Sequence, residues 1–157
     1  MTLLAAALLL AISAGPEAAQ DLTVESLATC RVSWLDAKDD QIEKIGATLT
    51  SSFTQKDQQP FLVPKGRSVV AGLPILRLFP ETVGMSVGFS AVVGADFDTA
   101  KKAFEKAAGV TFKDCEAGEG MRTCGLELAP KKTLMVLGSE KAAVKESVVG
   151  CVYFYER

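Results

Sequence analysis

The length, composition and charge of the chain set the first limits on its function. Its 157 residues suffice for one domain with a hydrophobic core. The formal net charge of −2 lacks the basic excess typical of proteins that bind nucleic acid, so we expect no nucleic-acid partner. The chain contains no histidine, which excludes histidine-based catalytic triads, the common zinc sites and histidine pH switches.

Residues 1–20 have the features of a secretory signal peptide. An uninterrupted apolar run covers residues 3–12, which is too short to span a bilayer, and sites suitable for cleavage lie between positions 13 and 20. No Lys or Arg precedes the run, so the alternatives are a short buried helix or a start of translation further downstream. The signal interpretation predicts an exported protein, periplasmic or secreted, with no integral membrane segment in the mature chain.

Four cysteines follow this segment, and an even number in an exported domain favours disulfides. Cys115 and Cys124 flank a stretch typical of a hairpin turn, which favours a local Cys115–Cys124 bridge and leaves Cys30 to pair with Cys151. Strand alternation places Cys115 and Cys124 on different faces, so this pairing requires a twisted hairpin end or a bulge. Metal binding by the thiolates is the alternative. It needs close pairs such as Cys-x-x-Cys, which the sequence lacks, so we predict no metal site.

Residues 21–157 are predicted to form a single α+β domain in two parts. The first part, residues 21–66, is a helical N-terminal segment followed by a loop. Its helices are expected at residues 22–30 and 36–50, because Ile42, Ile45 and Leu49 share one face of the second. The polar stretch 51–66 contains two prolines and is typical of an exposed loop. The second part, residues 67–157, supplies the sheet and the main helix.

Residues 83–93 are expected to form the central strand of the sheet. Apolar side chains occupy the odd positions, whereas small residues occupy most even positions: Gly84, Ser86, Gly88 and Ser90. Successive side chains of a strand point to opposite faces, so one face is apolar and the other is nearly bare backbone. The preceding stretch, 68–79, contains Pro74 and is expected to form an edge strand or two short strands.

The clearest helix is expected at residues 95–108. Asp96 suits its N-cap, Gly109 ends it, and one face carries apolar side chains at Phe97, Ala100, Phe104 and Ala107. Further strands are expected at residues 110–115, 122–128, 133–137 and 147–155. Short connections favour antiparallel neighbours, so we predict a mostly antiparallel curved sheet packed on this one main helix, after a short helical N-terminal segment.

The sequence offers little support for catalysis. Phosphate-binding glycine loops and the Ser-x-x-Lys pattern are absent. Asp114, Glu116 and Glu119 form an acidic cluster, but carboxylates perform acid–base catalysis only where burial separates their pKa values, and these three flank glycines in an expected turn. We therefore predict no catalytic residue and no cofactor.

The small-residue face of residues 83–93 is the one candidate interaction surface. Gly84, Ser86, Gly88 and Ser90 would permit close approach of a ligand or a partner strand. A second layer of the same domain, such as the 36–50 helix, is the alternative occupant. We predict an exported non-enzymatic domain that binds a protein partner or a small apolar ligand. The alternatives are a hydrolase-type enzyme that uses carboxylates or serine without histidine, and a structural component of the cell envelope.

Overall fold

The computed structural model describes residues 22–33, 37–83 and 86–153, and it shows an α+β fold dominated by antiparallel sheet, as the sequence predicts. The expected signal segment, Gly84 and the expected strand end at residues 154–155 lie outside the described residues. In chain order the elements are α1 (Val24–Ala28), α2 (Asp39–Ser52), β1 (Phe53–Gln55), β2 (Leu62–Pro64), β3 (Val69–Val70), β4 (Leu73–Phe79), β5 (Thr82–Val83), β6 (Ser86–Val93), α3 (Phe97–Ala108), β7 (Cys115–Gly118), β8 (Met121–Ala129), β9 (Lys132–Ser139) and β10 (Ser147–Tyr153).

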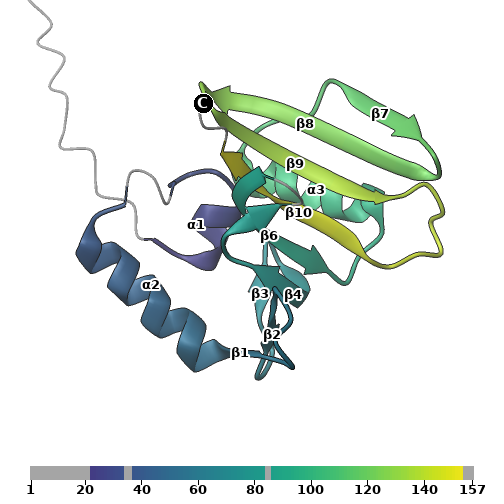
Figure 1. Ribbon diagram of the computed structural model, residues 1–157. Coiled ribbons are helices and arrows are strands. Elements are labelled where there is room, and N and C mark those ends of the chain that lie inside the picture. The colour runs from purple at the N-terminus through teal and green to yellow at the C-terminus, as the bar shows by residue number, and fades with distance from the viewer. Residues whose placement is uncertain (1–21, 34–36, 84–85, 154–157) are drawn as a thin grey trace, which may run out of the picture.

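Within the described residues, ten strands form one sheet through antiparallel pairings. The strand order is β1-β2-β4-β6-β10-β9-β8-β7, while β3 pairs with β4 and β5 pairs with β6. The strand β10 therefore lies in the middle of the sheet, and β7 lies at one edge. Figure 1 shows β8, β9 and β10 side by side, with α3 behind them and with α1 and α2 to the left.

Local sequence signals explain where α3 begins and ends. The Asp96 carboxylate accepts a hydrogen bond from the Thr99 amide at 3.0 Å and so caps the first turn. Gly109 adopts a left-handed conformation with φ 70°, which costs little in the absence of a Cβ. The inner side of the helix is buried, as the amphipathic spacing predicts, at Phe97, Ala100 and Phe104.

One side of the sheet, which we call the helix face, is covered by two helices. The helix α3 contacts β9 and β10, whereas α1 contacts β10, β6 and β3. The side chains of this face are between 0% and 1% exposed: Phe89, Ala91 and Val93 of β6, Val149, Cys151 and Tyr153 of β10, Leu134 and Val136 of β9, and Cys124 of β8. The core of the domain therefore lies between the helix face and the helices α1 and α3.

The helix α1 has only five residues and is held in place by links outside itself. A disulfide joins Cys30, two residues after α1, to Cys151 of β10. The guanidinium of Arg31 donates a hydrogen bond to the Ala107 carbonyl near the end of α3. The Glu25 carboxylate accepts a hydrogen bond from the Ala71 amide at 3.1 Å. These contacts attach α1 to the sheet, to α3 and to the turn between β3 and β4.

The hairpin expected from residues 110–115 has a different first strand. That strand is β7, in which Cys115 is the first residue and lies directly opposite Cys124. Glu119 and Gly120 form the turn with φ values of 55° and 79°, which suit the twist of a two-residue hairpin. The expectation that the two cysteines face opposite sides was wrong because Cys115 begins a strand instead of ending one.

Two other segments also differ from expectation. Val83 does not belong to the central strand, because it pairs with Ser86 in the antiparallel ladder of β5 and β6. Alternation alone did not show this break, because Val83 and Ser86 on its two sides continue the same alternation of apolar and small residues. The expected loop 51–66 contains β1 and β2, which pair with each other and are each three residues long. Strands of this length are too short for alternation to reveal.

Candidate functional site

The predicted row of small residues lies beside β10 on the side of the sheet opposite the helix face. Gly88 is the register partner of Val152, and Ser90 is the partner of Gly150. Both Gly88 and Ser90 are buried, with Ser90 only 2% exposed. Gly84 lies outside the described residues, and only the strand position of Ser86 is described. A binding role for this row stays a prediction, and the burial of Gly88 and Ser90 favours packing at their positions.

The approach of β6 to β10 explains why small residues are needed here. An ideal Cβ at position 150 would lie 2.4 Å from the Phe89 carbonyl oxygen and 2.6 Å from the Cα of Ser90. Neither contact can be relieved by rotating a side chain, because both atoms belong to the backbone of β6. Gly150 is therefore required by packing. The sequence pattern of residues 83–93 could not reveal it, since Gly150 lies in a different strand.

The small-residue row continues across the sheet into a larger surface, which we call the outer face. The register places three rows across β6, β10, β9 and β8: Val92, Val148, Leu137 and Thr123; Ser90, Gly150, Met135 and Gly125; and Gly88, Val152, Thr133 and Glu127. The residues on β6 are buried, whereas those on β9 and β8 are half-buried or exposed. The open part of the outer face is therefore over β9 and β8.

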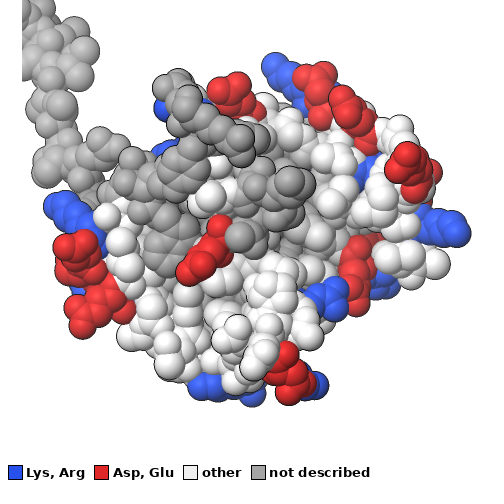
Figure 2. Space-filling view, viewed as in Figure 1, with Lys and Arg blue, Asp and Glu red and all other residues white. Residues whose placement is uncertain are grey.

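Apolar side chains stand on this open part of the outer face. Met135 and Leu137 of β9 and Val148 of β10 are each half-buried, and Met121 at the start of β8 is 41% exposed. In Figure 2, most Lys, Arg, Asp and Glu side chains lie towards the margin of the view and a few lie nearer its centre, where the described residues are mostly uncharged. Sequence reasoning missed these residues because the short apolar run of residues 133–137 was interpreted simply as a buried strand. In an antiparallel sheet, such a run can leave one apolar face open.

Sequence reasoning also missed a motif that bears on serine chemistry. Residues 84–88 read Gly-Met-Ser-Val-Gly, which matches the Gly-x-Ser-x-Gly pattern of α/β-hydrolase nucleophiles. That motif functions at a sharp turn from a strand into a helix. Here Ser86 is the first residue of the eight-residue strand β6, and it pairs with Val83 of β5. The structural context of Ser86 therefore differs from that of a nucleophile elbow.

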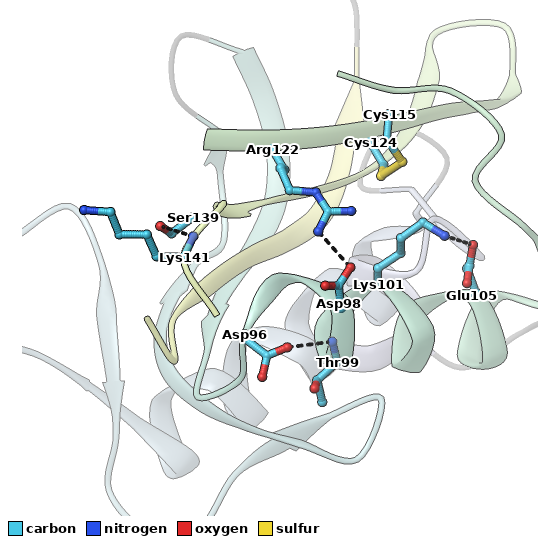
Figure 3. A network of polar contacts seen from close by, with 10 residues as sticks. All are labelled: Asp96, Asp98, Thr99, Lys101, Glu105, Cys115, Arg122, Cys124, Ser139 and Lys141. Carbon is cyan, nitrogen blue, oxygen red and sulfur yellow. Dashed lines mark hydrogen bonds and ion pairs between the residues drawn. A yellow bond between two sulfur atoms is a disulfide. The ribbon is translucent and has the colours of Figure 1, made fainter. Parts of the chain in front are cut away.

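On the helix face, an ion pair joins β8 to the first turn of α3. The Arg122 guanidinium lies 2.9 Å from the Asp98 carboxylate and 4.2 Å from the centre of the Phe97 ring. Figure 3 shows Arg122 extending from β8 towards Asp98. A negative charge near a helix N-terminus is favourable, and a guanidinium over an aromatic ring adds a cation–π contact. The arrangement fastens α3 to the sheet.

Two further carboxylates of this region are held in their ionised form. Lys145 donates a hydrogen bond to the Asp96 carboxylate at 2.7 Å. This hydrogen bond is the main reason why the pKa of Asp96 is lowered. Lys101 donates to Glu105 at 2.6 Å, and the Phe112 amide donates to the same carboxylate at 2.9 Å, so the pKa of Glu105 is also lowered. A general acid needs a raised pKa at neutral pH, so these carboxylates suit a structural role.

The acidic cluster expected near the hairpin tip is open to water. Asp114, Glu116 and Glu119 are all exposed, as a solvated turn requires. Across the part of the chain that the structure describes, no three side chains of His, Cys, Asp or Glu are grouped as metal ligands would be.

The structure contains two disulfides, which confirms the expectation of disulfide bonding. Cys30 pairs with Cys151 across 121 positions, and Cys115 pairs with Cys124 across nine positions. The first bridge is buried, since Cys30 is 6% exposed and Cys151 is 0% exposed. The second lies at the sheet edge, where Cys115 is exposed.

None of the described helices is both long enough and apolar enough to cross a bilayer. Comparison with protein families, with curated proteins and with solved structures finds no match for the chain.

Proposed function

We propose that the protein is exported and acts as a non-enzymatic binding domain, with the open part of its outer face receiving a protein partner. The main support for this proposal is that the side chains on the two faces of β9 differ in solvent exposure. On β9, Leu134 and Val136 are 0% exposed beneath α3, whereas Met135 and Leu137 point the other way and are half-buried. Partly exposed apolar side chains grouped on adjacent strands are typical of an interaction surface.

A protein partner suits this surface better than a small apolar ligand does. Small-ligand sites are usually concave and bury most of the ligand. Met135, Leu137 and Val148 stand instead on two adjacent strands of one sheet and are spread across its surface. Thr123, Thr133 and Glu127 add polar groups around them. Apolar side chains with a polar rim are the usual composition of a protein interface.

Export is supported by the N-terminal segment and by the disulfides. Residues 1–20 carry the apolar run and cleavage sites of a signal peptide, and disulfides persist in oxidising compartments. We propose a periplasmic or secreted location. The mass of the protein recovered from the producing cells, measured without reduction, should place its N-terminus between positions 14 and 21 with both disulfides formed. A mass that still includes residues 1–20 would contradict export with removal of a signal peptide.

Site-specific photo-crosslinking in the producing cells tests the binding surface. A photoreactive amino acid at position 137 should give an adduct of defined mass with a second protein. The matched control is position 42, because Ile42 is also apolar and is 42% exposed but lies on α2. Adding Met135→Lys should weaken the adduct from position 137 while the melting temperature stays unchanged. The absence of a protein adduct at position 137, or the same adducts from position 42, would contradict the proposal.

A further inference from the structure

The two disulfides occupy different physical environments. Cys30–Cys151 joins two buried residues and lies beneath α1 in the core. Cys115–Cys124 lies at the edge of the sheet, where every residue of β7 is exposed. Only Cys124 of this second bridge is buried, at 0% exposure. A reagent in solution therefore reaches the second bridge from the side of Cys115, and thiol–disulfide exchange depends on such access.

The edge strand β7 has few contacts apart from this bridge. It is four residues long, and among the described strands it pairs only with β8, through Met121, Arg122, Thr123 and Cys124. Short exposed edges with little apolar burial open at low free-energy cost, and the disulfide is the covalent link that keeps this four-residue ladder closed.

The strand β8 is anchored independently of β7. It pairs with β9 along its length, and Arg122 binds Asp98 of α3 at 2.9 Å. The turn after β7 is also tied to β9, since the Glu140 amide donates to the Gly120 carbonyl at 3.0 Å. Release of β7 would therefore leave β8, β9 and α3 in place.

We propose that Cys115–Cys124 is a thiol–disulfide exchange site that accepts electrons from a dithiol reductant and controls the pairing of β7 with β8. A thiolate of the dithiol attacks Sγ of Cys115, the Cys115–Cys124 bond breaks, and Cys124 leaves as a thiolate that takes a proton from water. The second thiol of the donor loses a proton to water, and the resulting thiolate attacks the donor sulfur that is bonded to Cys115 in the mixed disulfide. This step releases Cys115 as a thiolate, which takes a proton, and forms the disulfide of the donor. Two electrons pass from the dithiol to the protein.

Reduction changes the shape of the sheet edge. Once the bridge is broken, β7 separates from β8 and exposes the edge of β8 between Met121 and Cys124. The core disulfide Cys30–Cys151 remains oxidised and keeps the fold intact.

Graded reduction of the full-length exported protein with dithiothreitol, followed by alkylation and peptide mapping, tests the site. Cys115 and Cys124 should become labelled at a dithiothreitol concentration about tenfold lower than that needed to label Cys30 and Cys151. Reduction of both bridges together, or of the core bridge first, would overturn the proposal.

Hydrogen exchange tests the structural consequence. After selective reduction, amide exchange should increase in β7 and stay unchanged in β10. The double variant Cys115→Ser with Cys124→Ser should show the same increase without any reductant, and its melting should still be cooperative. Unchanged protection of β7 in both samples would show that the bridge does not control the strand.

Discussion

Replacing Gly150 by alanine should destabilise the domain, because position 150 has no room for a Cβ. The ideal Cβ would lie 2.4 Å from the Phe89 carbonyl oxygen, whereas real Cβ contacts under 3.0 Å essentially never occur. The two strands must therefore separate by at least about 0.6 Å, the difference between these distances. That movement stretches the hydrogen bonds between β6 and β10 at the middle of the sheet.

The magnitude follows from two costs. Overpacking of a tight site costs about 1–3 kcal/mol. Weakening one ladder hydrogen bond adds about 1 kcal/mol. We therefore expect Gly150→Ala to lower the free energy of unfolding by about 3 kcal/mol. For a domain of this size, that loss corresponds to a fall in melting temperature of about 6–12 °C.

Urea denaturation and thermal melting of the oxidised protein measure this effect, and Gly125→Ala is the matched control. Gly125 lies in the same row of the outer face, but its ideal Cβ would meet only a Thr133 methyl group at 3.7 Å, an ordinary contact. The control should stay within about 0.5 kcal/mol of the natural protein. If Gly150→Ala melts as the control does, the close approach of β6 and β10 is not what requires small residues on the outer face.

Three further changes test how α3 is held. Phe104→Ala should lower the free energy of unfolding by about 3–5 kcal/mol in urea denaturation, because the ring is 0% exposed; a loss below about 1 kcal/mol would contradict its place in the core. Arg122→Ala should cost about 1–2 kcal/mol through loss of its ion pair and its contact with the Phe97 ring, and high salt should reduce this difference in the same assay. Glu105 has a folded-state pKa lowered by Lys101, so its stabilisation is present above the unfolded pKa and is lost as pH falls through the folded value. Melting from pH 7 to pH 2 should therefore show less acid destabilisation for Glu105→Gln than for the natural protein, and equal pH profiles would exclude a contribution from Glu105.

The sequence predicted those elements that depend on local signals. The helix α3 was expected at nearly its observed bounds because its N-cap, its apolar stripe and its terminal glycine all belong to the same short stretch. Elements defined by distant partners were harder to predict. The helix α1 shares the helix face with α3, and its position depends on a disulfide to β10 and a carboxylate contact with the turn after β3. The cysteines indicated the Cys30–Cys151 bridge, but a helix of five residues carries too little periodicity to indicate the contact of Glu25 with the Ala71 amide.

The candidate surface was only partly visible in the sequence. Alternation in residues 83–93 identified a face of small residues, but it could not show that β10 approaches this face closely at Gly150. The exposed part over β9 was not expected, because an apolar run looks the same whether one or both of its faces are covered. Which face is covered depends on where the helices pack, and helix packing is a tertiary property.

The bridge between Cys30 and Cys151 has a consequence for the order in which this protein matures. Cys151 follows Cys30 by 121 positions, so the Cys30 thiol leaves the ribosome well before its partner has been synthesised. The first cysteines that it can meet are Cys115 and Cys124, and pairing with either would produce a wrongly linked chain. Correct maturation therefore requires either that the disulfides form late or that wrongly paired disulfides are isomerised afterwards.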